Sequence, residues 1–232
     1  MMNTCSLPLG AIGPVAETTN GQSRMQHALM QSLRAQPAAS RLAAVPAAAS
    51  DQDLLLAVGR GDRAACAELV ERHLDRILAF CEHMLGNRGE AEEVAQEVFV
   101  RVWTKAATWK PMGAKVTTWL FRIAKNLCLN RIARRRESSL EDAREPREER
   151  KQADALLEES EIGRHVRAAL ADLPDNQRIA ITLCHYQGWK NAEAAEMMEL
   201  SVEAVESLLA RGRRGLKKRL AEIAPALLRG AS

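Results

Sequence analysis

The chain has 232 residues, enough for one large domain or two small ones. Apolar residues make up 47% of it but aromatic residues only 3%, so Leu, Ala, Val and Ile must fill the core, which favours helices. The net charge is a mild +3, yet the charges are segregated, because two basic segments flank an acidic one. These features predict an all-α protein with a charged surface of uneven sign.

Several function classes find no support in the sequence. The five cysteines form no C-x-x-C pair, so neither a disulfide framework nor a compact zinc site is indicated. No apolar run reaches the roughly 20 residues of a membrane span. No glycine-rich phosphate loop or nucleophile elbow occurs. We therefore expect a cytoplasmic protein with no catalytic residue, no metal, no cofactor and no membrane insertion.

Residues 1–50 are rich in Ala, Ser, Gln and Thr and show no sustained periodicity, so we expect a disordered N-terminal extension. Its few basic residues, set against the single acid Glu17, give it a faint likeness to an organellar transit peptide. An over-extended start is a further alternative, with Met25 or Met30 as the true first residue.

Capping residues mark the first two helices. Ser50 and Asp53 form a variant of the capping box for a short helix that ends before Gly59. Asp62 can cap a longer helix, and Gly86 suits the left-handed residue that closes it.

A third helix is predicted over residues 90–107, with Val and Ala along one face. Off that face lie Glu93, Gln96 and Glu97. Acids early in a helix are stabilised by its dipole, which is the simple explanation. A surface that presents carboxylates to a basic partner is the functional alternative.

The stretch 116–136 combines an apolar stripe with a polar, basic face. We expect Thr117 or Thr118 to cap its start. The polar face can stack on bases, hydrogen-bond to base edges and neutralise phosphates, as nucleic acid with exposed bases requires. An ordinary amphipathic helix with a solvated basic end is the alternative. The residues of this face are Trp119, Arg122, Asn126 and Asn130, followed by the bases Arg131, Arg134, Arg135 and Arg136.

The segment from residue 137 to 161 differs from its neighbours, with ten acids against four bases and Pro146 within it. Such a composition is typical of a flexible linker. An acidic strand that occupies a basic nucleic-acid channel is the sharper hypothesis.

A second helical block follows. Helices are predicted over residues 162–173, 175–187 and 191–198, then a turn at 199–201 and a long helix from 202 to about 224. Two helices joined by so short a turn predict a helix-turn-helix. The last helix offers Ser and Arg early and bases to its end, which suits groove edges first and phosphates after. Close packing would explain Gly212 in its interior.

Three segments in this order carry a resemblance to a known family. They read AEEVAQEVFVRVW (91–103), TTWLFRIAKNLCLNRIARRR (117–136) and LPDNQRIAITLCHYQGW with AAEMMELSVEAVESLLARGRRGLK (173–189 and 194–217). Together they resemble the extracytoplasmic-function (ECF) class of bacterial RNA polymerase sigma factors. The resemblance implies two small helical domains, region 2 over residues 51–136 and region 4 over 161–228, joined by a flexible acidic linker, 137–160.

The resemblance also implies a function. The chain would be an alternative sigma factor that binds core RNA polymerase, recognises the −35 and −10 promoter elements and helps to melt DNA for a stress or environmental regulon. Its partners would be the β′ clamp coiled coil and β flap of the polymerase, promoter DNA, and an anti-sigma factor that holds it inactive. A free-standing helix-turn-helix regulator and an enzyme are the competing interpretations.

Roles carry over by position in the motifs. Glu93, Gln96 and Glu97 match the family's contacts to the β′ clamp. Asn126 matches a residue that helps to hold a flipped −10 base, and the residues assigned with it are Trp119, Arg122, Lys125, Asn130, Arg134 and Arg135. Ser207 and Arg211 match −35 groove contacts, and the residues assigned with them are Glu203, Glu206, Arg213, Arg214 and Lys218.

Two positions depart from the family pattern, because Glu206 and Leu208 stand where Arg is frequent. Glu206 would either accept a hydrogen bond from cytosine N4 or pair with Arg213. The −35 sequence preference therefore does not carry over.

Overall fold

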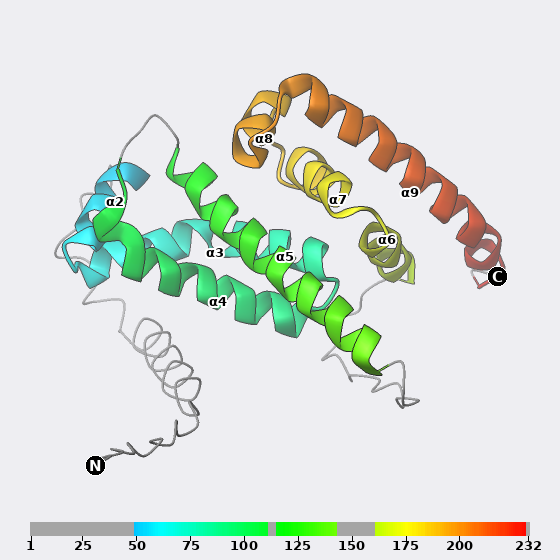
Figure 1. The fold of residues 1–232 in the computed structure, drawn as a ribbon, viewed down its shortest axis with the longest axis horizontal. Helices are drawn as coiled ribbons and strands as arrows, with labels where there is room; N and C mark the ends of the chain where they lie inside the picture. Colours follow the sequence, from blue (N-terminus) through cyan, green and yellow to red (C-terminus); the bar gives the residue numbers. More distant parts are fainter. Residues whose placement is uncertain (1–48, 111–114, 143–160, 231–232) are drawn as a thin grey trace, which may run out of the picture. The chain divides into compact units, whose positions relative to one another are not determined.

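The computed structural model describes residues 49–110, 115–142 and 161–230. Nearly all of the expected N-terminal extension, 1–50, lies outside the described residues. None of the described helices is both long and apolar enough to cross a membrane. Every regular element within these ranges is a helix (Figure 1): α2 (Asp51–Gly59), α3 (Arg63–Leu85), α4 (Arg88–Lys105), η2 (Ala106–Thr108), α5 (Val116–Asp142), α6 (Glu161–Ala171), α7 (Asp175–Ile181), η3 (Thr182–Tyr186), α8 (Asn191–Met198) and α9 (Val202–Gly230).

Capping residues fix the ends of the first two helices. Ser50 caps α2 in a complete capping box with Asp53, as predicted. The Asp62 carboxylate accepts hydrogen bonds from the Ala64 and Ala65 amides, at 2.8 and 3.1 Å, at the start of α3. Gly86 ends α3 with φ 68°, in the left-handed region that glycine adopts without steric cost. These caps satisfy amide and carbonyl groups that a helix end leaves unpaired.

Helix α5 differs from its prediction at both ends. It begins at Val116, and Thr118 is buried inside it, so the proposed cap by Thr117 or Thr118 is wrong. It continues to Asp142, through the first residues of the expected linker, because no Gly or Pro interrupts 137–142. The remaining linker, 143–160, lies outside the described residues.

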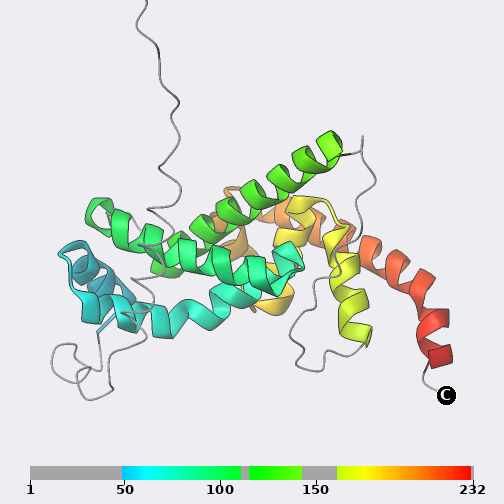
Figure 2. The ribbon, with the colours of Figure 1, turned by 90° about the horizontal axis from the view of Figure 1, so that it is seen from below.

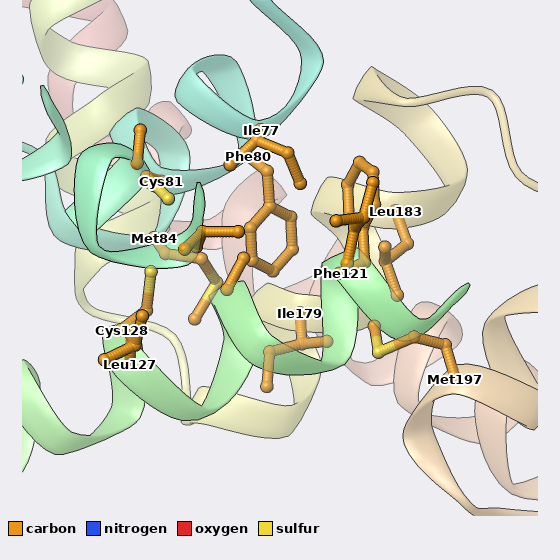
Figure 3. Close-up of a cluster of buried hydrophobic side chains, with 14 of the residues drawn as sticks. Ile77, Phe80, Cys81, Met84, Phe121, Leu127, Cys128, Ile179, Leu183 and Met197 are labelled. Atoms are coloured by element: carbon orange, nitrogen blue, oxygen red, sulfur yellow. The ribbon is translucent and has the colours of Figure 1, made fainter. Parts of the chain in front are cut away.

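One apolar core joins the N-terminal block (α2–α5) to the C-terminal block (α6–α9). Helix α3 packs against α6 and η3, and α5 packs against α8. In Figure 3, buried side chains of α3, α5, α7, η3 and α8 converge. Phe121 of α5 takes part in both blocks, since its ring centroid lies 5.3 Å from that of Phe80 and 4.9 Å from that of Trp189.

The C-terminal block contains the predicted helix-turn-helix, formed by α8 and α9. Before it, the expected helix over 175–187 changes character at Thr182 and continues as the π-helical segment η3, in which the Gln187 amide donates to the Thr182 carbonyl at 3.0 Å. In the turn, Glu199 adopts φ 60°, and the Ser201 hydroxyl accepts a hydrogen bond from the Ala204 amide. These features of the turn fix the direction in which α9 begins.

Two glycines let α9 lie close to its neighbours. A Cβ atom at Gly212 would lie 2.7 Å from Ile181 Cδ1, so the predicted close packing is confirmed. A Cβ at Gly215 would lie 2.9 Å from Leu173 Cδ2, and no local sequence pattern predicts this close approach. Each glycine costs about 1 kcal/mol of helix propensity against Ala, and the close approach of α9 offsets that cost.

Candidate nucleic-acid interface

The outer face of α5 presents amides and bases to solvent. Asn126, Asn130 and Arg134 are exposed, and Lys125 is half-buried. They fall on successive turns of one helix whose opposite side, including Leu120 and Ala124, is fully buried. The buried stripe thus fixes which way the amide groups point, and an exposed Asn can offer both a donor and an acceptor to a base edge.

Other members of the predicted −10 set have structural partners. Trp119 is half-buried and packs against the core. Arg135 donates through Nε to Glu90 at 3.0 Å and through Nη1 to the Leu85 carbonyl at 3.1 Å, so it fastens α5 to α3 and α4. Its guanidinium is therefore less available to phosphates than that of the exposed Arg134.

Arg122 contacts the other block. Its Nη2 donates to the Glu196 carbonyl at 2.7 Å, and its Nη1 lies 3.6 Å from the Glu199 carboxylate. Glu196 lies in the last turn of α8, where carbonyl groups carry the negative end of the helix dipole. The structure thus brings a predicted DNA contact against the helix-turn-helix.

The exposed side of α9 carries the predicted −35 set. All of its members are exposed: Glu203, Glu206, Ser207, Arg211, Arg213, Arg214 and Lys218. The buried side of the same helix, with Val205 and Leu209, anchors it to α7 and α8. A rigid helix therefore presents its polar start and basic end on one accessible side, the arrangement that groove reading requires.

Two carboxylates at the start of α9 are held in place. Its own backbone amide and the Ser201 hydroxyl keep the pKa of Glu203 below its ordinary value, so this side chain stays ionised. Glu206 accepts a hydrogen bond from Asn191 Nδ2 at 3.4 Å, a partner from α8 that the sequence did not suggest. Neither group suits a phosphate, but an ionised carboxylate can accept from cytosine N4.

The acidic side of α4 is tied to neighbouring arginines. Glu93 lies 2.8 Å from Arg131 of α5, and Glu97 lies 2.9 Å from Arg101 one turn along. Glu93 is exposed, while Gln96 and Glu97 are half-buried. The predicted docking residues therefore share one accessible face of α4, and surface ion pairs of this kind are weak enough for a partner to replace.

Several polar contacts between the blocks were not foreseen. Lys115 lies 2.8 Å from Glu193, and Arg136 donates two hydrogen bonds to Asp175, each of 2.9 Å. No local pattern pairs residues so far apart in sequence.

A buried cation was missed as well. Arg178 is 4% exposed, and it donates to the carbonyls of Met84 (2.7 Å), Ala171 and Leu173 (3.1 Å). Burial lowers its pKa, and the nearby Asp175 opposes that shift. The only sequence signal is a cation directly before the apolar run Ile179–Ile181.

The described ranges also bear on metal binding. Within them no group of three or more His, Cys, Asp or Glu side chains is arranged to hold a metal ion. The accessible groups described above are amides, guanidinium groups, carboxylates and the Ser207 hydroxyl, on the three helices α4, α5 and α9.

Comparison with known proteins identifies the family. The Sigma-70 region 2 model matches residues 69–138, and the Sigma-70, region 4 model matches residues 164–216. The ECF RNA polymerase sigma factor SigW of Bacillus subtilis is 32% identical over 177 residues, which span 72% of this chain and 94% of SigW. The chain belongs to the ECF RNA polymerase sigma factors. The RNA polymerase sigma-H factor of Pseudomonas aeruginosa is 30% identical, with 73% of this chain and 93% of that protein covered.

Solved structures agree with this assignment. The ECF sigma factor described here is similar to CnrH in its complex with the cytosolic domain of CnrY, at 28% identity and a TM-score of 0.55, covering 74% of this chain and 97% of CnrH. It shares its fold with RpoE from Bartonella quintana, solved with the anti-sigma factor NepR, at 22% identity and a TM-score of 0.55, covering 66% and 95% of the two chains. The predicted family and the all-α fold class are confirmed.

Proposed function

We propose that this ECF sigma factor is a promoter-specificity subunit that binds core RNA polymerase, recognises the −35 and −10 elements and helps to melt promoter DNA so that transcription can begin. The observation that carries the proposal is the succession of a region 2 match and a region 4 match, each with an accessible polar face, on α5 and on α9. The chain directs the chemistry of the polymerase, has no catalysis of its own, and acts in the cytoplasm.

Each face has a role in this proposal. Glu93, Gln96 and Glu97 on α4 dock on the basic β′ clamp coiled coil, and the C-terminal block meets the β flap. Asn126 on α5 holds a flipped base of the non-template strand, where hydrogen bonds to the base edge must return the few kcal/mol that unstacking costs. Arg134 and the bases of α9 bind phosphates, while Ser207 and Arg211 read the −35 groove.

Regulation by an anti-sigma factor is part of the proposal. RpoE of Bartonella quintana, which shares this fold, was solved with the anti-sigma factor NepR, and CnrH with the cytosolic domain of CnrY. A protein that covers α4 or the DNA faces would block both polymerase and promoter.

The decisive experiment is a pull-down of bacterial core polymerase by the full chain, paired with run-off transcription. Glu97→Lys should abolish binding and new transcripts while leaving the helical circular dichroism unchanged. The matched control is Glu71→Lys, an identical charge change at an exposed site of α3. If the chain does not bind the polymerase but binds duplex DNA with nanomolar affinity, it is instead the free-standing regulator.

A further inference from the structure

Asn191, the first residue of α8, holds a side chain of α9. Helices α8 and α9 pack against each other beside the turn that joins them (Figures 1 and 2). Across this junction Asn191 Nδ2 donates a hydrogen bond to Glu206 Oε1 at 3.4 Å. Asn191 is half-buried, whereas Glu206 is exposed. The hydrogen bond therefore ties a solvent-facing carboxylate to a side chain that is partly enclosed.

Two neighbours fix the orientation of the Asn191 amide. Its Oδ1 accepts a hydrogen bond from the Cys184 thiol, with 3.7 Å between the sulfur and the oxygen. Burial raises the pKa of this thiol, so the thiol keeps its proton and remains a donor. On the other side, a carboxylate can only accept, so Glu206 requires the NH2 end of the amide. Both neighbours therefore favour the same orientation, in which Asn191 presents a donor to Glu206.

One oxygen of the Glu206 carboxylate is left for a partner outside the chain. Oε1 accepts from Asn191, and the residues that the structure describes supply no partner for Oε2. Arg213, the alternative partner that the sequence allowed, forms no ion pair with Glu206 in the described ranges. The other acid at the start of α9 differs, because the Glu203 carboxylate accepts hydrogen bonds from its own backbone amide and from the Ser201 hydroxyl.

The chemistry of duplex DNA limits what this oxygen can accept from. Glu206 directly precedes Ser207 of the predicted −35 set, and every charged residue from Arg211 to Arg219 is basic. A carboxylate in such a DNA-binding helix is repelled by phosphate. In the major groove only adenine N6 and cytosine N4 donate hydrogen bonds, and adenine carries the acceptor N7 beside N6, which also repels a carboxylate. Cytosine is therefore the base that suits Glu206.

We propose that Asn191 is a positioning residue of the −35 site, which holds Glu206 so that the second carboxylate oxygen accepts a hydrogen bond from N4 of a cytosine. The inference rests on the proposed function and adds a residue of α8 to a reading site otherwise formed by α9. In a helix-turn-helix the second helix lies in the major groove while the first crosses the DNA backbone, so a hydrogen bond from α8 can hold a reading side chain at the groove. Ordering this side chain before binding lowers the entropy that base reading costs.

The test measures base preference at each −35 position. Holoenzyme assembled from the full chain and bacterial core polymerase transcribes a library of templates with a randomised −35 element and a −10 element taken from a mapped start site. Each template carries a barcode in its transcribed part, so sequencing of the transcripts reports which −35 elements were used. At one position the wild-type chain should favour cytosine, on either strand, by about tenfold over other bases.

Two substitutions should reduce this preference without changing the preferences at other positions. Glu206→Ala should lower it below about twofold, and Asn191→Ala should lower it to roughly threefold. In the Glu206→Ala background, Asn191→Ala should have no further effect, because it acts through that carboxylate. The matched controls are Glu196→Ala and Asn176→Ala, at exposed sites of α8 and α7, which should keep the wild-type preference.

Several results would overturn the proposal. They are a wild-type chain without a cytosine preference, a preference that survives Glu206→Ala, and an Asn191→Ala chain that loses transcription equally on all templates with its base preference unchanged. If Asn191→Ala folds poorly by circular dichroism, Asn191→Asp replaces the donor by a second carboxylate and should show the same loss of preference. Failure of the wild-type chain to direct any transcription by core polymerase would instead refute the proposed function.

Discussion

Arg178→Met tests whether hydrogen bonding or desolvation dominates the contribution of the buried guanidinium to the free energy of unfolding. Removing the cation relieves its desolvation cost, and replacing buried charges by apolar groups can stabilise a protein by about 1–4 kcal/mol. Here, however, three carbonyl acceptors lose a charged donor, and an unsatisfied buried acceptor costs about 1–3 kcal/mol. Water can reach the carbonyl of the exposed Ala171, but Met84 is fully buried. We therefore expect a net loss of about 2–4 kcal/mol.

Urea unfolding followed by circular dichroism measures this loss in the full chain. The control is Arg63→Met, at an exposed position in the first turn of α3, which should change the free energy of unfolding by less than about 0.5 kcal/mol. A more stable Arg178→Met protein would refute the reasoning, because desolvation would then outweigh the three hydrogen bonds.

Three further substitutions, one of them paired with a control, test other parts of the molecule. Asn126→Ala should weaken discrimination among −10 sequences in run-off transcription while polymerase binding stays near normal; an equal loss on every promoter would contradict the base-reading role. Arg211→Ala should cost about 1–3 kcal/mol of −35 duplex binding by holoenzyme if it reads a base, and the loss should vanish on a duplex altered at that base. Gly59→Ala would place a Cβ 3.0 Å from the backbone oxygen of Ala106, so thermal unfolding should show a loss of about 1–2 kcal/mol. Gly89→Ala, whose nearest atom lies at 3.4 Å, should be neutral or stabilising, and equal effects of the two changes would count against the packing argument.

The sequence allowed the helices to be predicted wherever a short-range interaction fixes an end. The Ser50–Asp53 box, the Asp62 cap and the left-handed Gly86 each depend on residues within four positions, so a local pattern suffices. The start of α5 was wrong because threonine is a common cap, yet the buried Thr118 lies within the helix. The preference of a residue for the cap position is overridden where its side chain is buried.

The candidate site was predictable in its exposed parts only. Periodicity placed Asn126 and the bases of α9 away from the core, and they are accessible. It did not reveal that Arg122 lies on α8 or that Arg135 is bonded to Glu90, since both contacts join residues more than forty positions apart. Such pairs depend on tertiary packing, and short-range sequence patterns do not predict which distant residues will meet.

The polar and the apolar contacts between the blocks should respond differently to salt. Rising ionic strength screens the exposed pairs Lys115–Glu193 and Arg136–Asp175. It does not weaken the contact of the buried Phe121 and Trp189 rings, because that contact rests on apolar burial and not on charge. Salt should therefore loosen the polar contacts between the blocks and leave the apolar ones intact.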